Sequence, residues 1–272
     1  MEDSVAFARL VAALRPWLGH LVIVGGWAHR LHRFHPLAST MEYLPLRTRD
    51  ADLALSLDTR LDGDLGAALK KAGFEEELSG DHTPPVTQYR LGDEDGGFYA
   101  EFLIQLRGSG TKRTGQPDAT VSKAGITAQK LRHIGLLLTE PWSIGGSDVG
   151  APLAGDVDLL VPNPVSFIVQ KVLIHKYRNP DKKAQDVLYI HDTLELFGAS
   201  LEQLRELWMD QVRATMPTQT IKTAQTAAKE LFREVTDTIR EAARIPQDRQ
   251  LMPERVRAAC EYGFGEVLGD VN

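Results

Sequence analysis

Apolar and polar positions follow two different patterns along the chain, and the change between them lies near Pro162. Before this residue, apolar side chains occur in short runs or alternate with polar ones, as in strands, and a few stretches have helical spacing. Helices are expected at 4–17, 27–34 and 65–72, and strands at 21–24, 51–57, 86–91, 98–106 and 157–161. Residues 1–162 are therefore predicted to form one domain, a mixed β-sheet with flanking helices.

Beyond Pro164 the apolar positions recur at the intervals of long helices. These helices are expected at 165–177, 184–197, 201–216, 221–243 and 253–268. Several long helices in succession indicate an all-helical second domain in residues 163–272. The predicted fold class is thus α+β, with the mixed sheet first and an all-helical C-terminal domain after it.

Composition limits the classes of protein that this chain can be. The single cysteine, Cys260, excludes an intramolecular disulfide framework, which is compatible with a reducing compartment. The N-terminus has acidic residues where a secretory signal peptide has basic ones. No apolar run approaches the roughly 18 residues that span a bilayer. We expect a cytoplasmic protein with no membrane partner.

Charge is unevenly distributed. The formal net charge of −6 argues against a protein that coats nucleic acid without specificity. Residues 107–132, however, contain six Lys/Arg and one acidic residue, and residues 164–183 contain five Lys/Arg and one acidic residue. Such runs are usually solvated surface, but their position beside the motifs below favours a functional interpretation. Residues 108–125 are also rich in Gly, Thr and Ser, which predicts a mobile surface loop.

Two motifs carry the chemistry. Asp50 and Asp52 are two positions apart on a predicted strand, so both carboxylates point to one face and can hold the same Mg²⁺ ions. Upstream, Gly25 and Gly26 end an apolar strand and open a helix, where backbone N–H groups can bind a phosphate. Taken alone, the two aspartates could be an acidic strand end, and the two glycines could be a tight turn. The order of the two motifs along the chain favours a functional site.

With this order of strand, Gly-Gly turn, helix and D-x-D strand, the chain resembles the nucleotidyltransferase superfamily. The resemblance implies a third carboxylate on a later strand, and Glu101 is the natural candidate because it lies in the apolar run 98–104. The alternative is an edge-strand glutamate that faces water. Trp27 replaces the small hydroxyl residue that often follows the glycines in this superfamily, so phosphate contacts are expected from the backbone or from Arg49.

More narrowly, the chain is similar to the AbiEii-type group, which includes the MenT-like toxins of two-gene toxin–antitoxin systems. The similarity rests on residues 24–28, residues 47–52 and the run from Pro164 to Tyr189. In that group a lysine on the first helix after the sheet and an aspartate on the next helix complete the site, and Lys171 and Asp186 match them. Without a role in a site, Lys171 would be a lysine whose apolar stem is buried and whose charged end reaches water, and Asp186 an aspartate in the first turn of a helix. His175 and Arg178 are expected on the helical face of Lys171.

The resemblance implies transfer of a nucleoside monophosphate from an NTP to a hydroxyl acceptor. Asp50, Asp52 and Glu101 would hold two Mg²⁺ ions, and the triphosphate would be bound by Gly25, Gly26, Arg49 and Lys171. The acceptor that the resemblance implies is RNA, for example a tRNA 3′ end, guided by the basic residues of 107–132, and the implied protein partner is a cognate antitoxin. The alternatives are a small-molecule, antibiotic-modifying nucleotidyltransferase and a degenerate nucleotide-binding protein.

Two other groups of residues compete with this interpretation. Gly145-Gly146-Ser147, followed by Asp156 and Asp158, repeats the turn and D-x-D pattern, but too few residues separate the parts for a helix. We therefore expect a strand that leads into the helix of Lys171. His29, His32 and His35 recur every three residues, whereas helical zinc sites favour i, i+4 spacing, so surface or site-rim positions are expected for them.

Overall fold

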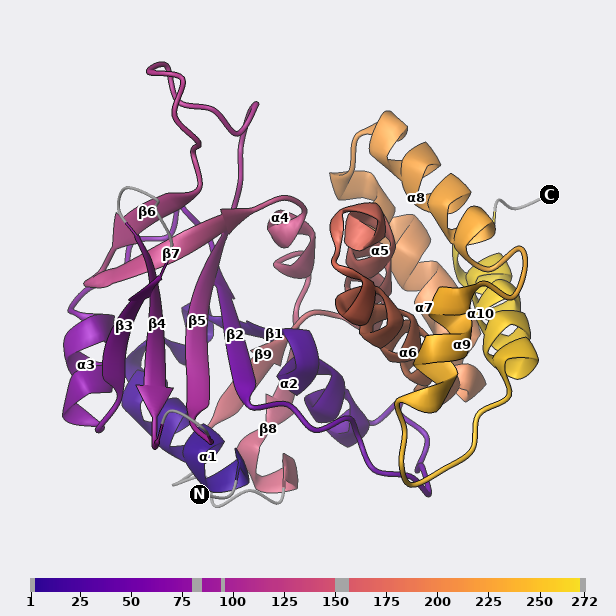
Figure 1. Cartoon of the computed structure of the whole chain (residues 1–272), viewed down its shortest axis with the longest axis horizontal. Coiled ribbons are helices and arrows are strands. Elements are labelled where there is room, and N and C mark those ends of the chain that lie inside the picture. Colours follow the sequence, from indigo (N-terminus) through magenta and orange to yellow (C-terminus); the bar gives the residue numbers. More distant parts are fainter. Residues whose placement is uncertain (1–2, 80–84, 94–95, 150–156, 270–272) are drawn as a thin grey trace. The chain divides into compact units, whose positions relative to one another are not determined.

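The computed structural model describes residues 3–79, 85–93, 96–149 and 157–269 (Figure 1). The chain divides into two compact units, which we call the sheet unit and the helical unit. The sheet unit comprises Met1–Phe34 and Arg47–Pro162, and the helical unit comprises His35–Leu46 and Asn163–Asn272. The change after Pro162 lies where the sequence pattern changes, whereas nothing in that pattern indicated that 35–46 belongs with the later helices.

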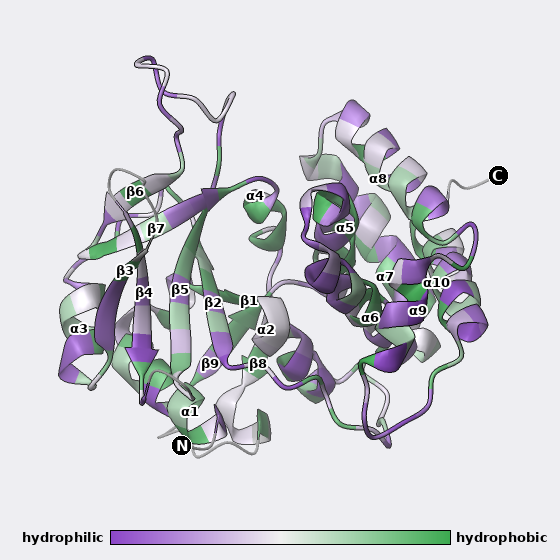
Figure 2. Cartoon of the chain, in the orientation of Figure 1, coloured by the Kyte–Doolittle hydropathy of each residue, from purple (hydrophilic) through white to green (hydrophobic). Residues whose placement is uncertain are grey.

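The sheet unit is built on a mixed sheet whose strands follow the order β3-β4-β5-β2-β1-β9-β8, with β6 and β7 attached through β5. β1 is antiparallel to β2, and β2 is parallel to β5. β1 carries apolar residues along its length, whereas β3 is polar (Figure 2). The strands in the described residues are β1 (Val22–Val24), β2 (Asp50–Leu55), β3 (Glu75–Ser79), β4 (Val86–Leu91), β5 (Phe98–Gln105), β6 (Thr120–Lys123), β7 (Ile126–Leu131), β8 (Trp142–Gly145) and β9 (Asp158–Val161).

Helices pack on this sheet through fully buried side chains. The helices of the sheet unit are α1 (Asp3–Leu14), α2 (Gly25–Leu31), α3 (Leu65–Lys71) and α4 (Ile134–Leu137). Trp27 of α2 is 1% exposed and stacks on Phe7 of α1 with ring centroids 3.9 Å apart. Stacked aromatic pairs add about 0.5–1.5 kcal/mol beyond the area that they bury. Trp27 therefore belongs to the core that fixes the start of α2, which explains why a large residue follows the glycine turn.

The helical unit contains α5 (Pro164–Ile174), α6 (Pro180–Leu196), α7 (Leu201–Leu207), α8 (Thr218–Leu231), α9 (Asp237–Arg244) and α10 (Pro253–Leu268). α6 is central and packs against α5, α9 and α10 (Figure 1). None of the described helices is both long enough and apolar enough to cross a bilayer. The architecture is α+β, a mixed sheet followed by helices, as the sequence predicted.

Several predicted elements were wrong in extent. The helix expected at 221–243 is two helices, because α8 ends at Leu231 and Thr236 caps α9 by accepting from the Ile239 N–H at 3.4 Å. The helix expected at 165–177 ends at Ile174, and Pro180 starts α6 four residues before the expected 184. Proline suits a first helical position, since its missing N–H is not needed there.

The predicted loop 108–125 ends earlier than expected, because β6 and β7 form a hairpin. Ala124 and Gly125 connect them with φ of 46° and 77°, the two positive values that a tight two-residue hairpin turn needs. Before β6, the described chain at 108–119 has no helix or strand, only a bridge between Thr111 and Pro117. Strands β3 and β8 and the short helix α4 were also not predicted.

Candidate active site

The glycine turn and the D-x-D strand meet at the centre of the sheet. β1 and β2 are antiparallel with Val24 opposite Asp52, so the residue after Val24 lies beside the Asp52 side chain. Gly25 has φ +65°, and a Cβ placed on it would lie 2.3 Å from Asp52 Oδ2. Only glycine accepts this backbone angle at no steric cost and leaves that space open. The turn therefore presents the backbone at the start of α2 directly to the Asp52 carboxylate.

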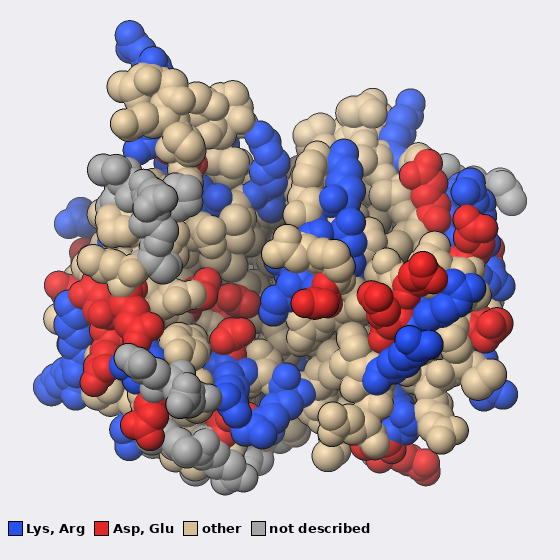
Figure 3. Space-filling model, viewed as in Figure 1, with Lys and Arg blue, Asp and Glu red and all other residues tan. Residues whose placement is uncertain are grey.

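The third predicted carboxylate lies next to Asp52. β2 and β5 are parallel, and their register pairs Asp52 with Glu101 and Asp50 with Tyr99. Paired residues of neighbouring strands project to the same face, so Asp52 and Glu101 share one face of the sheet. Asp50 lies on that face too, two residues before Asp52, and is exposed while Ala51 between them is buried. Acidic side chains are visible over β2 and β5 in Figure 3.

Glu101 has a neutral hydrogen-bond partner that the sequence did not reveal. Gln88 of β4 lies opposite Glu101 in the antiparallel register, and its side-chain amide donates to Glu101 Oε1. A glutamine in an alternating strand gives no signal of this contact until the register of β4 against β5 is known. The amide orients the carboxylate without adding positive charge. Residues that hydrogen-bond to a metal ligand commonly orient it in this way.

This donor set fits Mg²⁺. Asp50, Asp52 and Glu101 offer only carboxylate oxygens, the hard ligands that this ion prefers. Carboxylates on one sheet face repel each other unless a cation lies between them. Because Gly25 has no Cβ, the backbone that opens α2 lies against the Asp52 carboxylate, and backbone N–H groups at a helix start are groups that bind phosphate.

Arg49 lies at the edge of the same group. Its backbone carbonyl accepts from the Tyr99 N–H at 2.9 Å, which fixes the residue just before β2, and its side chain is exposed. The neighbouring Arg47 is used differently, since its Nε donates to Asp3 Oδ2 at 2.6 Å. Of the two arginines in the 47–52 motif, Arg47 is therefore tied to the start of α1, whereas Arg49 adjoins β2.

Lys171 and Asp186 form a buried ion pair in the helical unit. Lys171 Nζ on α5 donates to Asp186 Oδ1 on α6 at 2.5 Å, and the two side chains are 6% and 2% exposed. The ammonium also lies over the rings of Phe167 and Tyr189, 4.8 and 4.6 Å from their centroids. The second oxygen of Asp186 accepts from Arg178 Nε at 3.0 Å, and the Arg178 side chain is 39% exposed.

These charges determine the ionisation of Asp186. Burial opposes ionisation, but the positive charges of Lys171 and Arg178 outweigh it, and the pKa of Asp186 is lowered below its usual value. The carboxylate therefore stays ionised at neutral pH and can hold both cations. One detail of the prediction was wrong: since α5 ends at Ile174, His175 begins a separate 3-10 turn and Arg178 lies beyond it in extended conformation.

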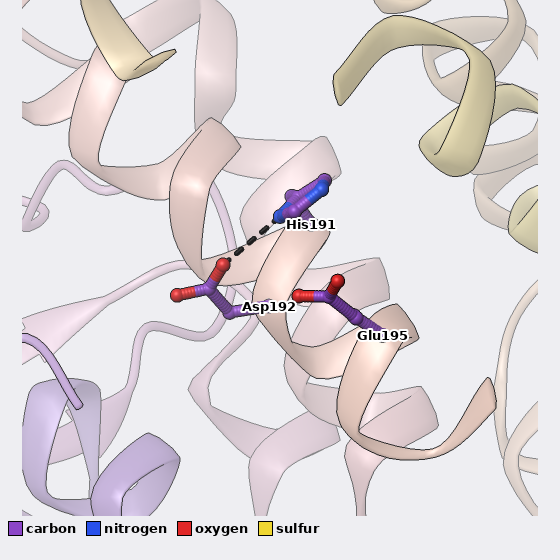
Figure 4. A group of neighbouring side chains, drawn as sticks. All are labelled: His191, Asp192 and Glu195. Atoms are coloured by element: carbon purple, nitrogen blue, oxygen red, sulfur yellow. Dashed lines mark hydrogen bonds and ion pairs between the residues drawn. The ribbon is translucent and has the colours of Figure 1, made fainter. Parts of the chain in front are cut away.

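A second acidic group lies further along α6. His191, Asp192 and Glu195 place one possible ligand atom each within 4.8 Å of one another (Figure 4). Arg249 already donates to Asp192 Oδ1 at 2.5 Å, and the Tyr43 hydroxyl donates to Glu195 Oε2 at 2.7 Å. A cation there would compete with the arginine for a carboxylate that is 2% exposed. We interpret the group as the anchor that ties the segment 35–46 to α6.

The competing candidates from the sequence are explained by the fold. Asp156 lies outside the described residues, and Asp158 is an exposed residue at the start of β9, opposite Gly145. β9 leads into α5, as predicted. His29 and His32 are 1% and 0% exposed, so the expectation of surface or site-rim histidines was wrong for both, because α2 packs its histidine face into the core. His32 Nε2 lies 2.7 Å from the Pro162 carbonyl oxygen.

Most of the cations in 107–132 serve the sheet unit itself. Four of the six bind neighbouring groups: Arg107 pairs with Asp58, Lys130 pairs with Asp118, and Lys123 and Arg132 donate to backbone carbonyls. Lys112 and Arg113 lie in the loop between β5 and β6, where Figure 3 shows basic side chains.

A comparison with known protein families agrees with this arrangement. A family model described as Nucleotidyltransferase (NTP_transf_8) matches residues 2–213, which include the sheet unit, α5 and α6. No curated protein and no solved structure matches the chain significantly. The match covers more than half of the chain and includes the glycine turn, the D-x-D strand and Glu101. The chain therefore belongs to the nucleotidyltransferase family, whose members transfer a nucleoside monophosphate from a nucleotide.

Proposed function

We propose that this protein transfers a nucleoside monophosphate from an NTP to a hydroxyl group of RNA, and that Asp50, Asp52 and Glu101 hold two Mg²⁺ ions for the reaction. The observation that carries the proposal is the pairing of Asp52 with Glu101 on parallel strands, beside a glycine turn so close that a Cβ on Gly25 would lie 2.3 Å from Asp52 Oδ2. The bound ions would lower the pKa of the attacking hydroxyl and neutralise the departing pyrophosphate. The strands that carry these carboxylates, β2 and β5, belong to one sheet, so the metal ligands are oriented before substrate binds.

The reaction forms a bond between the acceptor oxygen and the α-phosphorus and breaks the bond between that phosphorus and the bridging oxygen to the β-phosphate. The hydroxyl proton leaves to solvent, and pyrophosphate carries away the electron pair of the broken bond. Gly25 and Gly26 would hold the triphosphate through backbone N–H groups, and Arg49 would add a charged contact from the edge. None of these residues forms a covalent intermediate, because the chemistry is positioning and charge neutralisation.

In the helical unit we propose that Asp186 positions Arg178. Asp186 holds the Nε edge of the guanidinium, which leaves its two terminal nitrogens to bind a phosphate. Lys171 is nearly fully buried against the other oxygen of Asp186, so its proposed contribution is to keep that carboxylate charged and fixed. This modifies the expectation that Lys171 itself contacts the triphosphate.

The identity of the acceptor is the most specific part of the proposal. The similarity of 24–28, 47–52 and 164–189 to AbiEii-type and MenT-like proteins supports RNA, in particular a tRNA 3′ end, and with it a toxin that is controlled by a cognate antitoxin. The exposed Arg113, in the loop between β5 and β6, also favours a polyanion. Transfer to a small hydroxylated molecule is the second candidate, and a degenerate nucleotide-binding protein the third.

One experiment tests the reaction and its metal site together. Wild-type protein, Asp52→Asn and Asp158→Asn are each incubated with Mg²⁺, each radiolabelled NTP and total cellular RNA. Asp158→Asn is the matched control, because it makes the same change at another strand position in the same sheet. We expect labelled RNA with the wild type and the control, and at least a tenfold loss with Asp52→Asn, which is about 1.4 kcal/mol of transition-state stabilisation.

The outcomes separate the three candidates. Equal activity of Asp52→Asn and wild type would refute the metal site. Label in a small metabolite and none in RNA would replace the acceptor but keep the site. If calorimetry showed that NTP binding did not depend on Mg²⁺, and no acceptor were labelled, the degenerate binding protein would be the correct interpretation.

A further inference from the structure

The helical unit contains an open cavity of about 570 Å³ that plays no part in the proposed phosphoryl chemistry. It is lined by the end of α5, the 3-10 turn after it, one face of α8 and the start of α9. α5 and α8 pack against each other, so the walls come from elements that are fixed within one unit (Figure 1). Cavities of this size hold nucleotide-sized ligands. We call it the α5–α8 groove.

The groove combines an apolar surface with hydroxyl groups. Leu173 of α5 and Ala227 of α8 contribute apolar area, and Thr223 and Thr226 of α8 add hydroxyls. The hydroxyl of Thr223 donates to the Gln219 carbonyl at 2.8 Å, which leaves its oxygen able to accept a hydrogen bond. Apolar area suits the faces of bases, and hydroxyls suit the sugar 2′-OH by which proteins distinguish RNA from DNA.

Two lysines of the groove are not used in ion pairs. Lys176 and Lys222 have no carboxylate oxygen within 4.0 Å in the described parts of the chain. This contrasts with Arg107 and Lys130 in the basic stretch of the sheet unit, which are both paired. The lining also contains one carboxylate, Glu230, so the groove holds two lysines against one acid. An anionic ligand can bind these lysines without breaking an ion pair between described residues.

An exposed aromatic ring lies next to these groups. Tyr177 follows Lys176 in the 3-10 turn and is 70% exposed, so its ring is open to a stacking partner. Lys176 Nζ lies 4.8 Å from the centroid of its ring. His175, the preceding residue, lines the groove, and its buried Nδ1 has no hydrogen-bond partner in the described residues. An aromatic face beside a cation is the combination by which proteins bind single-stranded nucleic acid.

We propose that the α5–α8 groove binds a single-stranded segment of the RNA acceptor, with a base stacked on Tyr177 and backbone phosphates near Lys176 and Lys222. This inference rests on the proposed function and specifies it, because it gives the acceptor a binding surface outside the sheet unit. The rival ligands are a small metabolite and double-stranded RNA. Neither uses an exposed stacking ring together with two separated lysines.

Binding is measured first, without NTP, so that the result does not depend on catalysis. The probe is a fluorescein-labelled single-stranded RNA of about ten nucleotides, within the site sizes of single-strand binders. Loss of one stacked base in Tyr177→Ala should raise Kd at least about fivefold. Lys176→Gln with Lys222→Gln should flatten the slope of log Kd against log salt by about 1.4, two phosphate contacts on a single strand.

Two further variants test whether the groove itself binds RNA, or whether any positive charge on the surface is sufficient. Lys71→Gln with Lys229→Gln removes the same net charge from exposed lysines outside the groove and should leave Kd within about twofold of wild type, since it breaks no contact in the proposed surface. Thr226→Trp fills the groove without changing charge and should weaken binding. If the control double variant weakens binding as much as the groove double variant, or if Thr226→Trp and Tyr177→Ala bind as wild type does, the inference is wrong.

The transfer assay then distinguishes failure of the groove from failure of the function. If the wild type labels RNA and the groove variants label it with the same KM, the function stands and the groove is not the acceptor surface. If the groove variants lose RNA binding and the wild type labels only a small metabolite, the groove is supported as an RNA-binding surface and the proposed acceptor is refuted. We expect a raised RNA KM in the groove variants with the KM for NTP unchanged.

Discussion

Replacing Gly25 by alanine tests the contact on which the candidate site depends. The added Cβ would lie 2.3 Å from Asp52 Oδ2 and 3.3 Å from Asp52 Cγ, whereas ordinary contacts begin at 3.4 Å. The neighbouring atom belongs to a carboxylate held on a central strand, so the carboxylate must move by about 1 Å or the turn must open. Asp52 is the metal ligand nearest to the turn, and a displacement of about 1 Å at a reacting group costs roughly a hundredfold in rate.

The backbone makes a separate contribution. Gly25 has φ +65°, and an alanine at that angle costs about 1–2 kcal/mol of stability. Gly73, in the turn between α3 and β3, provides the matched control, because its φ is +90° and its nearest neighbours would be 3.8 Å from a Cβ. Both variants should therefore lose stability, but only Gly25→Ala should lose activity.

The assay combines labelled-NMP transfer, Mn²⁺ binding monitored by electron paramagnetic resonance, and thermal unfolding. We expect kcat/KM of Gly25→Ala to fall about a hundredfold with weaker Mn²⁺ binding, and Gly73→Ala to keep near wild-type activity. If Gly25→Ala unfolds like Gly73→Ala and yet transfers within threefold of wild type, the turn does not constrain Asp52, and our account of the site is refuted.

Three further predictions follow from single contacts. Gln88→Leu removes the amide that orients Glu101, and Mg²⁺ affinity should fall about 10–100-fold in calorimetry with little change in Tm; unchanged affinity would contradict the role of Gln88. Lys123→Gln loses charged hydrogen bonds to the carbonyls of Ser56 and Leu57, at 3.1 and 2.5 Å, so urea unfolding should show a loss of about 1.5–3 kcal/mol with KM for NTP preserved. Asp186→Asn leaves the buried Lys171 charge without its carboxylate and should cost about 3–5 kcal/mol near pH 7. Because the folded pKa of Asp186 is lowered, wild type keeps this contribution above about pH 4 and loses it as pH falls through the folded pKa, so the two Tm curves should converge only in acid.

Local pattern was sufficient where one residue's neighbours in sequence decide its environment. The apolar run 21–24, the glycines after it and the alternation around Asp50 and Asp52 predicted β1, the start of α2 and β2, because burial and backbone angle are local properties. Lys171 and Asp186 were singled out by the resemblance to the AbiEii-type group, and the structure brings these two side chains together.

Other features arose only from pairing between distant segments. β6 and β7 are short and partly polar, so their alternation is weak until β7 pairs with the end of β5. The single helix expected at 221–243 continued the apolar spacing across Thr236, and the break depends on a cap that competes with helix continuation. The number of lysines and arginines in 107–132 does not reveal that Arg107 and Lys130 are held in ion pairs.

The sequence by itself determined the α+β class and the order of the glycine turn and the D-x-D strand, because hydrophobic periodicity and backbone preference act over a few neighbouring residues. Only the tertiary structure decided that Asp52 meets Glu101 in register, that the Gln88 amide donates to Glu101, and that Gly25 lies against Asp52. It also decided that Lys176 and Lys222 line one groove. Such contacts join residues far apart in the chain, and their geometry is set by strand register and helix packing, which no local pattern encodes.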